Sequence, residues 1–107
     1  MSHQMLDAYA RLLTIDTKAC AELFDADAQY STHIGSQELV FVGRDDIEGF
    51  LRHVPRQLTF RAAACRRDGD SFRGEVTVIG DGFTPRAHFV CYYVADGLFT
   101  RFDVQHP

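Results

Sequence analysis

The segment FVCYYVADGLFTRFDV, residues 89–104, decides the fold of this chain. Two runs of aromatic and β-branched residues flank Asp96-Gly97, a pair that is typical of a two-residue hairpin turn. Two further turns rich in Asp and Gly, residues 68–70 and 80–82, separate the strand-like runs that come before. Residues 57–105 therefore predict four consecutive antiparallel strands joined as a meander.

Helical patterns precede and interrupt the strands. Apolar residues recur at helical spacing in three segments, residues 5–13, 19–24 and 43–54. Two more short strands are expected at residues 28–34 and 39–42. Asp16-Thr17 predicts a helix stop followed by an N-cap, and Pro55 ends the third helix. We expect one α+β domain over residues 1–107, with three helices packed on a mostly antiparallel sheet of five or six strands.

Composition argues against several classes of function. The 107 residues have a net charge of −4, and no basic run exceeds Arg66-Arg67, so we expect no nucleic-acid partner. No segment approaches the ~20 apolar residues of a membrane span and no leader pattern is present, so we expect a cytoplasmic protein without a membrane partner. The cysteines and histidines lack ligand spacing, and no glycine-rich phosphate loop occurs. We therefore expect neither a metal nor a cofactor.

Pairing Ala95 with Leu98 across the last hairpin assigns side chains to the two faces of the sheet. One face mixes polar and apolar residues: Arg86, His88, Val90, Tyr92, Val94, Phe99, Arg101, Asp103 and Gln105. The other is mostly apolar: Ala87, Phe89, Cys91, Tyr93, Leu98, Thr100, Phe102 and Val104. The mixed face has the composition of a ligand pocket. Three short helices can cover only one face of the sheet. The other face therefore needs a partner, because contiguous exposed apolar surface usually marks an interface, and we expect a homodimer that packs through the sheet.

Arg101 and Asp103 also admit a second interpretation. They lie two residues apart on one strand, so both point to the same side of the sheet. At a wet edge of the sheet they would bond to cross-strand neighbours and contribute about 0–1 kcal/mol to stability. The residues alone do not decide whether Arg101 and Asp103 belong to a pocket or form a surface pair.

Three segments resemble a known superfamily: YARLLTIDTKACAELFDADAQY (residues 9–30), VGRDDIEGFL (residues 42–51) and VADGLFTRFDV (residues 94–104). In this order they are similar to the SnoaL-like, nuclear-transport-factor-2-like superfamily, which includes ketosteroid isomerases, polyketide cyclases, dehydratases and limonene-epoxide hydrolases. The resemblance implies a cystatin-like cone, in which three N-terminal helices close over the concave face of a strongly curved sheet. It also implies that Tyr9, Arg101 and Asp103 point into the pocket and that the protein forms dimers.

The resemblance to cyclases and dehydratases implies acid/base chemistry on a small, largely apolar carbonyl or hydroxyl compound. His88 would take a proton, Asp103 would orient the imidazole or return the proton, and Arg86 or Arg101 would balance enolate charge. Eight further residues are expected to line the pocket: Tyr9, Leu13, Tyr30, Thr32, Phe50, Val90, Tyr92 and Phe99.

Two alternatives remain open at this stage. Limonene-epoxide hydrolases imply a site built from Arg73 and Glu75 with Asp103 and the run Tyr30-Ser31-Thr32. A non-catalytic binding or assembly domain is the other alternative, because nine Phe could fill the cone. A cavity of about 300 Å³ or more would favour ligand binding or catalysis.

Overall fold

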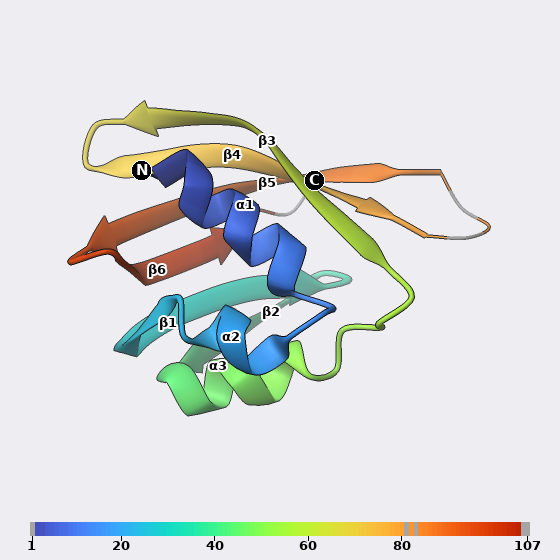
Figure 1. The fold of residues 1–107 in the computed structure, drawn as a ribbon, viewed down its shortest axis with the longest axis horizontal. Coiled ribbons are helices and arrows are strands. Elements are labelled where there is room, and N and C mark those ends of the chain that lie inside the picture. The colour runs from blue at the N-terminus through green and yellow to red at the C-terminus, as the bar shows by residue number, and fades with distance from the viewer. Residues whose placement is uncertain (1, 81, 83, 106–107) are drawn as a thin grey trace.

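The architecture is seen in a computed structural model that describes residues 2–80, 82 and 84–105 (Figure 1). It contains three helices: α1 (Ser2–Leu12), α2 (Thr17–Ala21) and α3 (Arg44–Leu51). It contains six strands: β1 (Phe24–Ile34), β2 (Gln37–Val42), β3 (Thr59–Asp68), β4 (Ser71–Ile79), β5 (Arg86–Ala95) and β6 (Leu98–Val104). The predicted α+β class and the number of helices and strands are confirmed.

The six strands form one sheet in the order β2-β1-β6-β5-β4-β3. All neighbouring strands are antiparallel except β1 and β6, which run parallel. The predicted meander corresponds to β3 to β6, and the chain closes by placing β6 beside β1. Figure 1 shows the helices on one side of this sheet, with α1 crossing in front of β5 and β6 and with α2 and α3 near β1.

Two details of the predicted cone are wrong. The third helix does not belong to the N-terminal part, because α3 follows β2 in the chain. The sheet is also not strongly curled. It stays open, with β2 and β3 as its two edges, although register shifts occur in three of the five strand pairings, β1–β6, β3–β4 and β5–β6.

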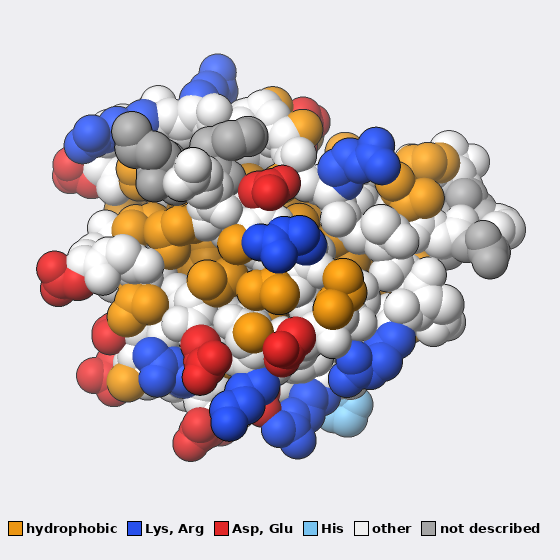
Figure 2. Space-filling model, viewed as in Figure 1, with side chains coloured by type: hydrophobic (Ala, Val, Ile, Leu, Met, Phe, Trp, Pro, Cys, Tyr) orange, Lys and Arg blue, Asp and Glu red, His pale blue; other side chains and the backbone are white. Residues whose placement is uncertain are grey.

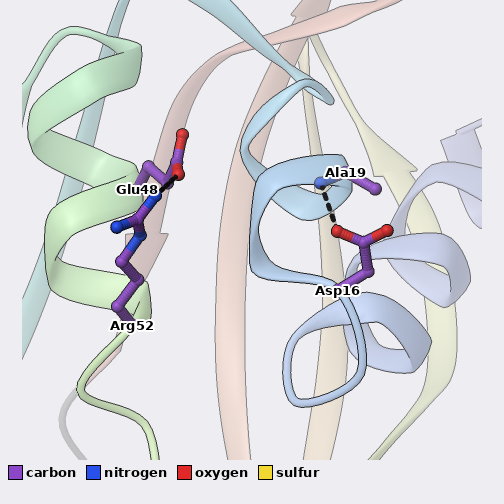
Figure 3. A network of polar contacts seen from close by, with 4 residues as sticks. All are labelled: Asp16, Ala19, Glu48 and Arg52. Atoms are coloured by element: carbon purple, nitrogen blue, oxygen red, sulfur yellow. Dashed lines mark hydrogen bonds and ion pairs between the residues drawn. The ribbon is translucent and has the colours of Figure 1, made fainter.

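The helix ends follow local chemistry that the sequence indicated. Asp16 caps α2, and its Oδ1 accepts a hydrogen bond of 3.0 Å from the backbone N–H of Ala19 (Figure 3). On α3, Arg52 pairs with Glu48 one turn earlier. Arg44, at the start of α3, donates from Nε and Nη2 to the carbonyl oxygen of Phe24 at 2.9 and 2.7 Å. Arg44 therefore ties α3 to the start of β1.

An aromatic core lies between the helices and the sheet. Its rings belong to residues of α1, β1, β5 and β6: Tyr9, Phe24, Tyr30, Tyr92, Phe99 and Phe102. Each of these side chains is at most 3% exposed. On the helix-covered side, hydrophobic side chains are still visible among charged ones (Figure 2). The helices thus cover the inner face of the sheet without sealing it completely.

A β-bulge in β6 overturns part of the predicted face assignment. Ala95 pairs with Leu98 as expected, and Val94 pairs with Phe99, but Tyr93 then pairs with Arg101. Thr100 is therefore an extra residue, and every later side chain of β6 changes face. Two consequences follow for residues beyond the bulge.

Beyond the bulge, Phe102 and Val104 lie on the inner face, opposite Tyr92 and Val90. Asp103 lies opposite Cys91, on the outer face that the helices leave uncovered. The prediction that Arg101 and Asp103 share a face with Phe99 is wrong for this reason.

Candidate functional site

A cavity of about 340 Å³ lies on the inner face of the sheet, bordered by α1, α3 and the strands β1, β3, β4, β5 and β6. Six of the eight predicted lining residues border it: Tyr9, Leu13, Tyr30, Thr32, Phe50 and Val90. The catalytic candidate His88 borders it as well. This volume exceeds the threshold of about 300 Å³ that favours a ligand site over a filled core.

Tyr92 and Phe99 do not border the cavity, so their prediction as lining residues is wrong. Both are fully buried, and their rings meet edge to face with centroids 5.2 Å apart. Tyr92 also stacks on Phe102. The aromatic core therefore fills one part of the inner face and leaves the cavity beside it.

Two tyrosines that line the cavity are joined through their hydroxyl groups. Tyr9 on α1 and Tyr30 on β1 share a hydrogen bond of 2.7 Å between their hydroxyl oxygens. Burial raises the pKa of both phenols well above the usual value, so both remain protonated at neutral pH. One hydroxyl donates to the other, and the accepting tyrosine keeps its own O–H proton. We call this pair the tyrosine dyad.

The tyrosine dyad is held by aromatic contacts. The rings of Tyr30 and Phe102 are stacked, with an interplanar angle of 1° and centroids 5.3 Å apart. Phe102 also contacts Tyr9 at 4.5 Å between centroids, and Tyr30 contacts Phe50 at 5.7 Å. These contacts restrict the ring orientations and so fix the direction of the hydroxyl groups.

The remaining lining of the cavity is apolar with a few neutral polar groups. His88 lies on β5 opposite Val76 of β4, and Thr32 and Gln105 supply a hydroxyl and an amide. Among the described lining residues, none is Asp, Glu, Lys or Arg. A cationic ligand would find no carboxylate partner among these residues, whereas a neutral ligand with one oxygen would match the dyad.

The structure separates the other two catalytic candidates from His88. Asp103 Oδ1 accepts a hydrogen bond from Ser31 Oγ at 2.6 Å, and Arg101 Nε lies 2.9 Å from Asp103 Oδ2. Because of the bulge at Thr100, this cluster lies on the outer face, whereas His88 faces the cavity. The predicted pair of His88 and Asp103 around one ligand is therefore not formed.

Arg73 and Glu75, the candidates of the epoxide-hydrolase alternative, also lie outside the cavity. They are outer-face residues of β4, paired across the strands with Cys91 and Phe89. Arg73 forms an ion pair of 2.8 Å with Asp68, and both side chains are more than half exposed. These residues do not meet the tyrosine dyad, and they fit the solvent side of a strand.

Sequence reasoning missed several residues that border the cavity. They are His33, Gly35, Val54, Phe60, Val76, Val78, Val104 and Gln105. Phe60 and Val78 were detectable in principle, because antiparallel pairing of β3 and β4 places them opposite each other on the inner face. Val104 was not detectable, because it reaches the inner face only through the bulge at Thr100.

The outer face of the sheet carries exposed hydrophobic side chains. Four are prominent, with between 38% and 58% of their surface accessible: Val40, Val42, Phe89 and Tyr93.

No helix of the described chain is long and apolar enough to cross a membrane. Within the described residues, no group of three or more His, Cys, Asp or Glu side chains is arranged to hold a metal ion.

Comparisons with known proteins identify the fold. No family model matches the chain, and no curated protein matches its sequence. A putative ketosteroid isomerase from Kribbella flavida is 20% identical with a TM-score of 0.77, and the match covers 99% of this chain and 78% of that one. A putative polyketide cyclase from Sinorhizobium meliloti is 20% identical with a TM-score of 0.75, covering 95% and 94%.

A third structure similar to this chain is a hypothetical protein from Catenulispora acidiphila with a ketosteroid isomerase-like fold, in complex with trimethylamine. It is 20% identical with a TM-score of 0.73, and the match covers 96% of this chain and 85% of that one. At these identities the similarity shows the fold alone. The expected resemblance is confirmed at that level: the chain has the nuclear-transport-factor-2-like, ketosteroid isomerase-like fold.

Proposed function

We propose that this chain, with its nuclear-transport-factor-2-like fold, binds a small, uncharged and largely apolar molecule that carries a carbonyl or hydroxyl oxygen. The observation that carries the proposal is the tyrosine dyad at the wall of a cavity of about 340 Å³. Ligand pockets of this size are mostly apolar and contain few polar groups, which fix the orientation of the ligand.

The dyad favours a ligand that carries an oxygen atom, because one O–H proton of the dyad has no acceptor within the pair. The tyrosine that accepts within the dyad has one O–H proton left, and Tyr9 and Tyr30 are each only 3% exposed. A hydrocarbon in the cavity would keep this donor away from water without a partner, at a cost of about 1–3 kcal/mol. A ligand oxygen that accepts the proton removes this cost.

His88 supports acid/base chemistry as the reaction class, in the manner of an isomerase, cyclase or dehydratase without a cofactor. A neutral imidazole would remove a proton from the carbon next to the carbonyl, and the oxygen of the resulting enolate would accept a hydrogen bond from the remaining O–H of the dyad. The proton would return from the imidazole to another carbon. Some proteins of this fold are described as a putative isomerase and a putative polyketide cyclase, which supports the same class.

Binding without catalysis is the second candidate function. The observation in its favour is that the described lining contains no carboxylate to orient the imidazole of His88, since Asp103 lies on the outer face. The relative crystallised with trimethylamine makes a small ligand plausible for this fold without implying a reaction.

We also propose a homodimer that packs through the outer face. The exposed side chains of Val40 and Val42 on β2 and of Phe89 and Tyr93 on β5 support it, because large apolar side chains left exposed on one face of a sheet often mark an interface. The three cysteines are free thiols, which supports a reducing location such as the cytoplasm.

Calorimetric titration with a matched pair of probes tests the binding proposal. 1-Tetralone carries one carbonyl oxygen, and tetralin is the corresponding hydrocarbon. We expect the ketone to bind more tightly to the wild type. In the double variant Tyr9→Phe/Tyr30→Phe we expect its affinity to fall by about tenfold, since a net hydrogen bond contributes about 0.5–1.5 kcal/mol. Each single variant should lose less, because the remaining hydroxyl can donate directly.

Tetralin affinity should not fall in any of these variants, and in the double variant it should rise, because no buried O–H donor is then left without a partner. Equal affinity of the wild type for the two probes, or no change in the double variant, would contradict the binding proposal. Exchange of the C2 protons of 1-tetralone with deuterated solvent then separates catalysis from binding. We expect the wild type to accelerate this exchange and His88→Gln to abolish the acceleration while ketone affinity stays within about twofold.

A further inference from the structure

The parallel pair of β1 and β6 carries two clusters of side chains back to back. Tyr30 is the Cα partner of Phe102, and the next residues, Ser31 and Asp103, are partners in turn. Successive side chains on a strand point to opposite faces. The pair of Tyr30 and Phe102 therefore belongs to the inner face with the cavity, and the pair of Ser31 and Asp103 belongs to the outer face.

The outer cluster links the same two strands that hold the tyrosine dyad. Ser31 is 6% exposed and donates to Asp103 Oδ1 at 2.6 Å, while Arg101 Nε donates to Asp103 Oδ2 at 2.9 Å. A hydrogen bond to a carboxylate is shorter and stronger than one between neutral groups. Ser31 and Asp103 thus form a strong side-chain link across β1 and β6, one residue away from Tyr30 and Phe102.

The described pairing of β1 and β6 needs such a link. It is parallel, and its register shifts between Phe24 and Gln29, so regular pairing covers only the three consecutive pairs from Gln29 to Ser31. Parallel pairing is slightly less stable per residue than antiparallel pairing. The side-chain link from Ser31 to Asp103 lies at the last of these pairs and opposes local slippage of the two strands.

We propose that Ser31, Asp103 and Arg101 are positioning residues that hold the Tyr30 hydroxyl against Tyr9 from the opposite face of the sheet. The inference rests on the proposed function in that the positioned group is the donor for the ligand oxygen. A shift of β1 by a few tenths of an ångström would stretch the 2.7 Å bond of the dyad beyond the optimal range.

The bulge at Thr100 has two effects on the site. It removes the charges of Arg101 and Asp103 from the apolar cavity, where burial would be costly. It also leaves both residues directly behind the dyad, on the strand that pairs with Tyr30. The charges in this strand therefore serve the site without touching the ligand.

The proton that bridges Tyr9 and Tyr30 provides the test, because it needs no ligand. Shielded from water, it should give a separate downfield proton NMR resonance in the wild type. We expect this resonance to move upfield and broaden in Ser31→Ala and in Asp103→Ala, and to return to its wild-type position in Ser31→Thr, which keeps the hydroxyl. The matched control is Glu75→Ala, which removes an outer-face carboxylate on β4. In this variant the resonance of the bridging proton should have its wild-type position.

Ketone selectivity provides the second readout. We expect Ser31→Ala to lower the ratio of 1-tetralone to tetralin affinity by at least threefold, with tetralin affinity unchanged and Ser31→Thr like the wild type. If Asp103→Ala does not fold, the comparison of Ser31→Ala with Ser31→Thr tests the positioning role by itself. A bridging-proton resonance that is identical in Ser31→Ala and the wild type would overturn the positioning role. Failure of the proposed function would show separately, as a wild type that does not discriminate between the two probes.

Discussion

Gly74 lies on β4 where α1 packs against the sheet, and its replacement by alanine is a sharp test of this packing. A Cβ atom at Gly74 would lie 2.5 Å from Cδ2 of Leu6, 3.5 Å from the carbonyl oxygen of Ala63 and 3.6 Å from Cα of Cys65. The first distance is about 1 Å shorter than an optimal carbon–carbon contact. Leu6 is fully buried, so its side chain can make room only by shifting within the packed core.

Two opposing terms set the size of the effect. Overpacking of this kind costs about 1–3 kcal/mol. The loss of glycine freedom in the unfolded chain gives back about 0.5–1 kcal/mol. We therefore expect Gly74→Ala to lower the free energy of unfolding by about 1–2 kcal/mol, which corresponds to a fall in Tm of roughly 4–16 °C for a domain of this size.

Urea and thermal unfolding of a double-mutant cycle provide the assay. Leu6→Ala alone should cost about 2–5 kcal/mol because it leaves a cavity. The variant with both changes should be more stable than the sum of the single effects predicts, because the new methyl group occupies part of that cavity. The control is Gly49→Ala on α3, where no atom lies within 4 Å of the added Cβ, and a gain of about 0.5–1 kcal/mol is expected. A wild-type stability of Gly74→Ala, or strictly additive effects in the cycle, would refute the reasoning.

Three further predictions concern the helix cap, alkaline pH and association. Asp16→Ala should cost about 0.5–2 kcal/mol in urea unfolding, because Ala19 N–H loses its capping acceptor; an unchanged midpoint would contradict the cap. Burial raises the pKa of Tyr9 and Tyr30, so above about pH 10, where unfolded tyrosines ionise and the folded ones do not, stability should fall as pH rises. The double variant Tyr9→Phe/Tyr30→Phe should show a shallower decline, and an equal slope would argue against buried phenols. In light scattering the wild type should have the mass of a dimer and Phe89→Glu that of a monomer; a monomeric wild type would exclude the proposed association.

Most of the fold was readable from the sequence because its helices and hairpins have local signals. Asp96-Gly97 marks the last hairpin, and the pairing of Ala95 with Leu98 follows from a two-residue turn. The cap at Asp16 follows from the chemistry of orphan N–H groups at a helix start. The parallel pairing of β6 with β1 has no such signal, since it depends on contacts between the two ends of the chain.

The candidate site was only partly readable for one physical reason. Side-chain alternation is reliable along a regular strand, and it correctly predicted His88 and Val90 on the face with the cavity. A single extra residue at Thr100 inverts the alternation, and no residue type in LFTRFDV marks the bulge. Arg101 and Asp103 were therefore assigned to the wrong face, although their proximity to each other was correct.

The vibrational spectrum of a bound ketone tests most directly whether the tyrosine dyad holds a ligand oxygen. We would record the infrared carbonyl band of ¹³C-labelled 1-tetralone bound to the wild type and to Tyr9→Phe/Tyr30→Phe. A hydrogen bond to the carbonyl oxygen weakens the C=O bond, so the account predicts a lower wavenumber in the wild type than in the double variant. A band at the same position in both proteins would contradict it, because the ketone would then lie in the cavity without contacting the dyad.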